Sequence, residues 1–150
     1  FVRTVGEAQA VIEVLERNGL RRGENDLKVI MMCEIPSNAA VPELFLEHFD
    51  GFSIGSNDLA QYVLACDRSN GALAPLMDPL HPAVLELISR TAEHGRRAGI
   101  SVSLCGDMAG DPRCLPALLN CGLRELSVNA SALAQIKHTI DRLSSGGSVG

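Results

Sequence analysis

The chain has 150 residues, a length that suits one domain of ordinary size rather than two. Its net charge is −5, and it lacks the basic stripe of nucleic-acid-binding proteins, so we expect no nucleic-acid partner. No apolar run approaches the ~20 residues needed to span a bilayer, so we expect no membrane partner either.

The chain begins with Phe1-Val2-Arg3, which is typical of a strand end, and it has no initial methionine. We therefore expect a fragment of a longer protein. Thr4 and Glu7 then have the spacing of a capping box, and Gly19 is placed to end the helix that follows.

Four further apolar runs are typical of strands, and each is followed by a helical pattern. The predicted strands are residues 28–34, 49–55, 100–105 and 123–128. The predicted helices lie around residues 37–47, from Pro82 to a stop at Gly99, and after Asp111-Pro112 and Ser131. The Gly/Ser-rich residues 144–150 are expected to form a flexible tail, which leaves residues 1–143 as the domain.

Strands separated by helices of this length predict an α/β fold with parallel strands and right-handed crossovers. An open doubly wound sheet and part of a (β/α)₈ barrel both fit this pattern. In either case ligands bind at the carboxyl ends of the strands.

The chain contains five cysteines, an odd number, without a CxxC pair and without a signal-like N-terminus. Reduced thiols in the cytoplasm are the simplest interpretation. Cys33, Cys114 and Cys121 fall within or next to predicted elements, and we interpret them as structural.

Polar residues follow the predicted strands where each strand ends: Glu34, Asn57-Asp58, Cys105 with Asp107, and Asn129. Since the carboxyl ends of parallel strands share one rim of a sheet, we expect these side chains to converge. A helix-capping role is an equally open interpretation for Asn129.

Glu34 and Asp58 follow neighbouring strands, and their carboxylates are the hard oxygen ligands that Mg²⁺ or Mn²⁺ prefers. The alternative is that Asp58 caps the next helix while Glu34 pairs with a lysine. Asn57, Arg68 and the start of a helix near Leu59 offer donors to a phosphate, although Arg68 is also placed to pair with Asp67 or Asp78.

Cys105 ends a buried strand and precedes Gly106, where the backbone can turn sharply. A thiol with an ordinary pKa near ~8.5 is mostly protonated at neutral pH, so Cys105 is a candidate proton donor. The alternative is that Cys105, like most buried cysteines, is an inert apolar residue.

Two stretches, Met31-Met32-Cys33-Glu34-Ile35-Pro36-Ser37-Asn38 and residues 49–59 (FDGFSIGSNDL), resemble the PEP-utilising enzyme family. That family comprises phosphoenolpyruvate synthase, pyruvate phosphate dikinase and enzyme I of the sugar phosphotransferase system. The first half of the chain resembles phosphoenolpyruvate synthase more, whereas residues 78–84 and 104–112 are more similar to enzyme I. The resemblance covers roughly residues 1–140.

The resemblance implies a (β/α)₈ barrel of which this chain holds approximately strands four to eight. It also implies that Glu34 and Asp58 bind Mg²⁺, or Mn²⁺ in its place, and that Asn57 and Arg68 hold the substrate phosphate. Cys105 would protonate the enolate carbon of pyruvate. We add Asp107 to the substrate-binding candidates, although family members of the enzyme I and dikinase type usually have Glu there.

The implied reaction moves a phosphoryl group between phosphoenolpyruvate and a histidine on a phosphohistidine domain of the same longer chain. An isolated fragment is expected to be inactive, and its open strand edges favour a homodimer. A phosphoenolpyruvate synthase-like enzyme is the leading hypothesis, with enzyme I as the alternative. A metal-dependent aldolase or lyase that acts through a pyruvate enolate is a further alternative.

Overall fold

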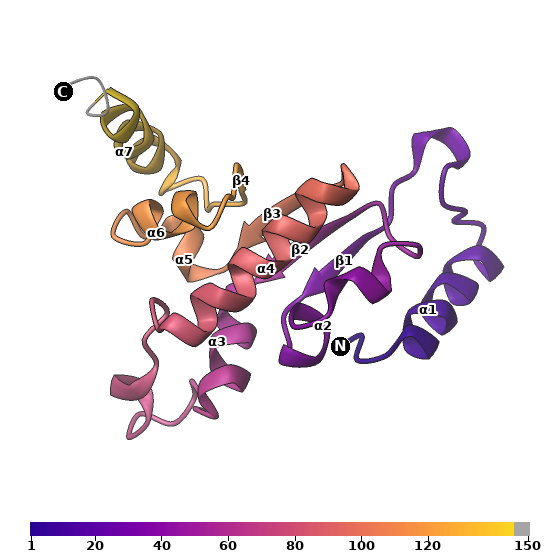
Figure 1. The fold of residues 1–150 in the computed structure, drawn as a ribbon, viewed down its shortest axis with the longest axis horizontal. Coiled ribbons are helices and arrows are strands. Elements are labelled where there is room, and N and C mark those ends of the chain that lie inside the picture. The colour runs from indigo at the N-terminus through magenta and orange to yellow at the C-terminus, as the bar shows by residue number, and fades with distance from the viewer. Residues whose placement is uncertain (146–150) are drawn as a thin grey trace.

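The structure, a computed structural model, describes residues 1–145 (Figure 1). Its elements in chain order are α1 (Val5–Arg17), η1 (Glu24–Asp26), β1 (Ile30–Cys33), α2 (Pro36–Ala39), η2 (Pro42–Phe45), β2 (Gly51–Gly55), α3 (Ser56–Leu64), η3 (Ala74–Leu76), α4 (Pro82–Ala98), β3 (Ser101–Cys105), α5 (Asp107–Gly110), α6 (Leu115–Asn120), β4 (Glu125–Leu126) and α7 (Leu133–Ser145).

The four strands form one parallel sheet in the order β1-β2-β3-β4, as the strand and helix pattern predicted. The spatial order follows the chain order without a reversal. A doubly wound sheet contains a point where the order reverses, whereas a barrel adds each strand beside the last. Of the two architectures left open by the sequence, the arrangement is therefore that of a (β/α)₈ barrel segment.

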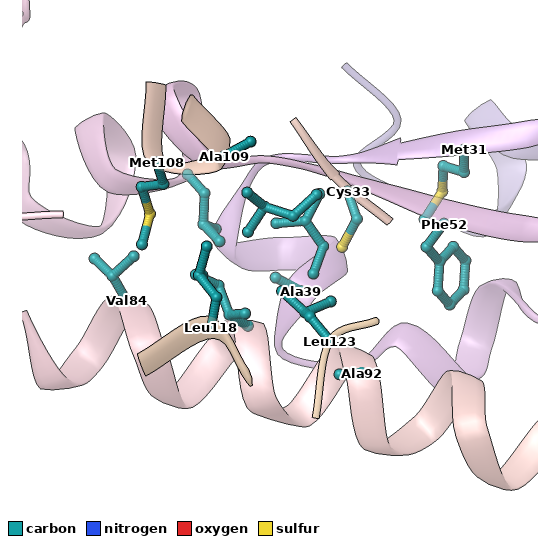
Figure 2. Close-up of a cluster of buried hydrophobic side chains, with 14 of the residues drawn as sticks. Met31, Cys33, Ala39, Phe52, Val84, Ala92, Met108, Ala109, Leu118 and Leu123 are labelled. Atoms are coloured by element: carbon teal, nitrogen blue, oxygen red, sulfur yellow. The ribbon is translucent and has the colours of Figure 1, made fainter. Parts of the chain in front are cut away.

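Among residues 1–145, α4 packs along one face of the sheet. Met31 and Phe52 are buried on that face, opposite α4 (Figure 2), and the strand register places the buried Leu104 on the same face. Ile30 and Met32 alternate with the buried residues of β1 and are 45% and 42% exposed. A barrel segment has one face covered by helices and one open face, since its inner face points toward the barrel axis.

The two longest helices predicted from the sequence are confirmed. Thr4 is the N-cap of α1, where its hydroxyl accepts from the Glu7 N–H at 3.2 Å. The Glu7 carboxylate accepts from the Arg3 N–H rather than closing the box on Thr4. α4 begins at Pro82 and is capped by Gly99, as predicted.

Other parts of the chain differ from the sequence prediction. The helix expected around residues 37–47 is two short pieces, α2 and η2, because Pro42 lacks the N–H that would continue a helix. The last two helices begin a few residues later than predicted, and α5 was not predicted. Residues 1–3 are not a strand end; the Val2 carbonyl accepts instead from the Asn38 side chain at 2.9 Å.

The predicted tail, residues 144–150, overlaps α7, which continues through Ser145. Residues 146–150 lie outside the described residues. Within residues 1–145, no helix combines the length and the apolar character that crossing a membrane requires.

Asp50 joins the start of β1 to the start of β2 at the rim opposite the predicted site. Its carboxylate accepts from the Val29 N–H at 2.8 Å and from Arg22 Nε at 2.8 Å. Burial raises the pKa of Asp50, but the hydrogen bonds from Val29 and Arg22 outweigh it and hold the pKa below the usual 3.8. Arg22, which also donates to the Glu47 carbonyl at 2.7 Å, thus forms a structural clamp with Asp50.

We expect Asp50→Asn to lower the free energy of unfolding by about 2 kcal/mol at pH 7, because Val29 and Arg22 donate to different carboxylate oxygens and Asn replaces one of these with an NH₂ group, which cannot accept. A carboxyl with a lowered folded-state pKa stabilises the protein above its unfolded pKa, and the stabilisation is lost as the pH falls through the folded value. Urea denaturation of both chains should therefore show a constant difference from pH 7 to about 5 that shrinks below about 4. Asp141→Asn, at an exposed position, is the control. A difference independent of pH would contradict the role of the Asp50 charge.

Candidate functional site

The structure brings the predicted site residues to one rim of the sheet. Glu34 directly follows β1, and Asn57 and Asp58 occupy the first turn of α3, which directly follows β2. Cys105 is the last residue of β3, and Asp107 is the first residue of α5. Arg68 follows α3 in a loop and reaches back to the same rim. Their convergence, which the sequence argument predicted, is confirmed.

Glu34 reaches over the end of β2 because Gly55 has no side chain there. A Cβ at Gly55 would lie 2.8 Å from Cβ and from Oε2 of Glu34 and 3.2 Å from Met32 Sδ. These distances are closer than such atoms approach one another. Glycine at this position therefore gives the Glu34 carboxylate room to turn toward α3.

The Glu34 carboxylate lies close enough to Asp58 for the two charges to interact. Partial burial raises the pKa of Glu34, and the Asp58 carboxylate raises it further. The chain terminus and Arg68 act in the opposite direction. Two carboxylates held together in this way repel each other, and a cation between them removes the repulsion.

The donor set therefore fits a divalent cation with hard oxygen ligands. Glu34 and Asp58 supply two such ligands from adjoining elements. Among residues 1–145, no group of three or more His, Cys, Asp or Glu side chains gathers as a metal cage. A substrate and water would have to complete the coordination, which is the manner in which Mg²⁺ is commonly bound.

Arg68 forms an ion pair with Asp58, with 3.3 Å between Nη2 and Oδ1. The sequence alternatives were pairs with Asp67 or Asp78. The Asp67 carboxylate instead accepts from the N–H and hydroxyl of Ser69. The Arg68 side chain is 51% exposed, so its guanidinium faces solvent as well as Asp58.

Asn57 and Asp107 are joined by two hydrogen bonds. Asn57 Nδ2 donates to Asp107 Oδ2 at 3.1 Å, and the Asp107 N–H donates to Asn57 Oδ1 at 2.9 Å. The amide of Asn57 is thereby oriented with one N–H still available. The structure thus places Asp107 beside a predicted substrate-binding residue.

The Cys105 thiol is half-buried at the rim, on the open face of the sheet. Ser53 Oγ donates to Cys105 Sγ at 3.8 Å, and the thiol points to Met32 Sδ at 3.9 Å. Cys33, by contrast, lies under the sheet with no exposed area, and burial raises its pKa to about 12. Burial also raises the pKa of Cys114 and Cys121. The interpretation of these three as structural agrees with their environment.

Two hollows flank Asp107 at the rim. The smaller, of about 180 Å³, is lined by Asn57, Arg68 and Asp107 together with Ser56, Ala60, Met77, Pro79, Met108, Asp111 and Cys114. The larger, of about 690 Å³, contains Cys105, Asp107 and Asn129 in its lining. The anion-binding candidates and the thiol therefore face adjoining spaces.

Sequence reasoning missed Ser56, which is 1% exposed and donates from its hydroxyl to the Cys105 carbonyl at 2.7 Å. Its position between a strand and a helix is visible in the sequence, but its partner on another strand is not. It also missed Ser53 and Met32, the neighbours of the thiol. Their place on the open face follows from alternation along β1 and β2.

Comparison with known proteins gives a consistent result. Residues 1–145 match the family model described as PEP-utilising enzyme, PEP-binding domain. The phosphoenolpyruvate synthase of Escherichia coli (strain K12) is 48% identical over 136 residues, which are 90% of this chain and 17% of that protein. The phosphoenolpyruvate-protein phosphotransferase of Cupriavidus necator is 45% identical over 139 residues, 91% of this chain and 24% of that protein. The chain therefore spans less than a quarter of the length of these relatives.

Among solved structures, a HpcH/HpaI aldolase/citrate lyase family protein from Burkholderia cenocepacia J2315 matches with a TM-score of 0.55. It is 23% identical and covers 89% of this chain and 48% of the other. At this identity the likeness concerns the fold alone, and it agrees with the α/β barrel segment described above.

The different environments of the thiols predict an order of alkylation. We expect iodoacetamide at pH 8 to modify Cys105 first and Cys33 last, because Cys105 is partly exposed whereas Cys33 is fully buried with a strongly raised pKa. Mass spectrometry of the peptides after timed quenching measures each rate, and the denatured chain is the control in which the rates converge. Equal rates for Cys33 and Cys105 in the folded chain would contradict this assignment.

Proposed function

Since the chain belongs to the PEP-utilising enzyme family, through the family's PEP-binding domain, we propose that its rim binds phosphoenolpyruvate and pyruvate during phosphoryl transfer. The observation that carries the proposal is the convergence of Glu34 and Asp58 beside Arg68, with the Cys105 thiol on the adjoining strand. This set contains two metal ligands, an anion-binding cation and a proton donor.

Glu34 and Asp58 would hold a Mg²⁺ ion, with Mn²⁺ as a substitute. Bound there, the ion would supply positive charge to the enolate oxygen and to the phosphoryl group. The support in this chain is the raised pKa of Glu34, which partial burial raises most and the neighbouring Asp58 carboxylate raises further.

Arg68 and Asn57 would bind the phosphate of phosphoenolpyruvate. A guanidinium binds phosphate oxygens through two parallel N–H donors, and Asn57 has an N–H left after its contacts with Asp107. When the substrate binds, Arg68 would leave its exposed ion pair with Asp58 and bind the phosphate instead. Asp107 would orient the Asn57 amide at the substrate.

Cys105 would complete the reaction at the carbon end. The bond between the phosphorus and the enol oxygen breaks, the phosphoryl group passes to a histidine nitrogen, and an enolate of pyruvate is left. The Cys105 S–H then gives its proton to the methylene carbon, which becomes the methyl group of pyruvate. The resulting thiolate regains a proton from solvent.

The histidine would lie on a phosphohistidine domain of a longer protein, of the phosphoenolpyruvate synthase or the enzyme I kind. Identities of 48% and 45% favour the synthase only narrowly. In either case we expect the complete protein to be a magnesium-dependent enzyme of the cytoplasm. We expect the 150-residue chain alone to be inactive. The homodimer expected from the open strand edges stays a prediction, which sedimentation velocity of the purified protein tests.

We expect Gly55→Ala to weaken Mn²⁺ binding at least about tenfold, because the methyl group would lie 2.8 Å from Glu34 Oε2 and would displace that carboxylate. Electron paramagnetic resonance of free Mn²⁺ measures the affinity. Gly71→Ala is the matched control, since a Cβ there meets nothing within 4 Å. Unchanged Mn²⁺ affinity in Gly55→Ala would remove Glu34 from the metal site.

Cys105→Ala distinguishes phosphoryl transfer with enolate protonation from the aldolase or lyase alternative. In the complete protein we expect this variant to lose the interconversion of pyruvate and phosphoenolpyruvate by at least about a hundredfold, the typical contribution of general acid–base catalysis, while Mn²⁺ binding is retained. A coupled assay and the Mn²⁺ titration measure the two properties. Activity equal to that of the unaltered protein would favour the aldolase class.

A further inference from the structure

The turn formed by Cys105, Gly106 and Asp107 is fastened to the first turn of α3. Ser56 Oγ donates to the Cys105 carbonyl at 2.7 Å, and Asn57 makes its two hydrogen bonds with Asp107. Three hydrogen bonds thus join residues about fifty positions apart in the chain. Asp58, the proposed metal ligand, is the next residue of the same helical turn.

Gly106 allows this close attachment. Its φ is +92°, and a Cβ there would collide with Ser56 Oγ and lie 2.8 Å from Asn57 Oδ1. A side chain would therefore push the turn away from α3 as well as strain the backbone. The Cys105–Asp107 turn rests directly on Ser56 and Asn57.

Ser56 differs from Asn57 in its surroundings. Its side chain is only 1% exposed, although it contributes to the lining of the smaller hollow beside Asn57. A hydroxyl buried to this degree needs a partner, and the Cys105 carbonyl is that partner. Since this carbonyl belongs to the residue that carries the thiol, the hydrogen bond restricts the backbone from which the Cys105 side chain projects.

We infer that Ser56 is a positioning residue, which holds the Cys105 thiol in fixed relation to the helical turn that bears Asp58. The inference rests on the proposed function in one respect: the thiol is the group that protonates the enolate. Ser56 touches neither substrate nor metal in this scheme. It acts through the Cys105 backbone.

A role in positioning and a role in stability alone predict different results. If Ser56 contributes only stability, its loss has the same consequence as the loss of any other buried hydroxyl. Thr91 is the matched control: it is 0% exposed, lies on α4 beneath the sheet, and donates to the Leu87 carbonyl at 2.9 Å. Thr91→Val removes that hydroxyl, which also lies 3.7 Å from the buried Cys33 thiol, and leaves the contacts of Cys105 and Asp107 in place.

The experiment compares Ser56→Ala, Thr91→Val and the unaltered complete protein. Peptide mass spectrometry follows the alkylation of Cys105 by iodoacetamide, and NMR follows the Mg²⁺-dependent exchange of pyruvate methyl protons with deuterated solvent. We expect Ser56→Ala to change the Cys105 alkylation rate about fivefold, the factor that one hydrogen bond of ordinary net strength represents. We expect the kcat of exchange to fall about tenfold with the KM for pyruvate within about twofold, since a misplaced thiol affects the chemical step.

Thr91→Val is expected to leave the Cys105 alkylation rate and the exchange kinetics unchanged. Equal Cys105 alkylation rates in Ser56→Ala and the unaltered protein would overturn the inference, as would equal effects of Ser56→Ala and Thr91→Val. If Ser56→Ala does not fold, Ser56→Cys retains the volume with a weaker donor and serves for the same comparison.

The two proposals fail in different ways. If the unaltered protein exchanges no pyruvate protons, the proposed function fails, and the alkylation rates still decide whether Ser56 positions the thiol. If exchange occurs but the Ser56 variants exchange and alkylate normally, only the positioning role is refuted.

Discussion

The register of β2 between β1 and β3 determines where every polar group at the rim lies. Ile54 is paired with Cys33 and Leu104, and Gly55 is paired with Cys105. Since neighbouring strands are about 4.8 Å apart, the residues that end these strands are within reach of one another. A slip of one residue in either pair would turn the thiol or the carboxylate to the helix-covered face. The proposed chemistry therefore depends on strand pairing before it depends on any side chain.

Two glycines leave room for the groups that this register brings together. At Gly55 the absence of a Cβ leaves room for the Glu34 carboxylate, and at Gly106 it lets the turn after β3 rest on Ser56 and Asn57. A carboxylate and a backbone turn therefore occupy positions that side chains would otherwise fill. The remaining groups come from α3, whose first turn follows β2 without a connecting loop. The end of β2, Gly55 and the first turn of α3 therefore together determine where these groups lie.

The sequence was sufficient to predict the four strands of the sheet, although not their bounds, together with α1, α4 and the convergence of the polar residues at one rim. Apolar periodicity predicts which segments are buried strands, and parallel strands have their carboxyl ends at one rim. The sequence therefore placed Glu34, Asp58 and Cys105 at that rim without any knowledge of distances. Contacts between segments distant in sequence were not predictable in this way. The bond from Ser56 to Cys105 and the clamp of Arg22 on Asp50 join residues 49 and 28 positions apart. No local pattern in the sequence indicates that these residues meet.

Arg68 shows how the charges of the site can serve two purposes. Its pair with Asp58 is half exposed, and exposed ion pairs contribute only about 0–1 kcal/mol because water screens them. The interaction that holds Arg68 at the rim is therefore weak enough to be exchanged for a phosphate. Without a ligand, the guanidinium reduces the repulsion between Glu34 and Asp58. A cation bound by these carboxylates would take over that role and release Arg68 toward the substrate, so metal and phosphate binding would favour each other.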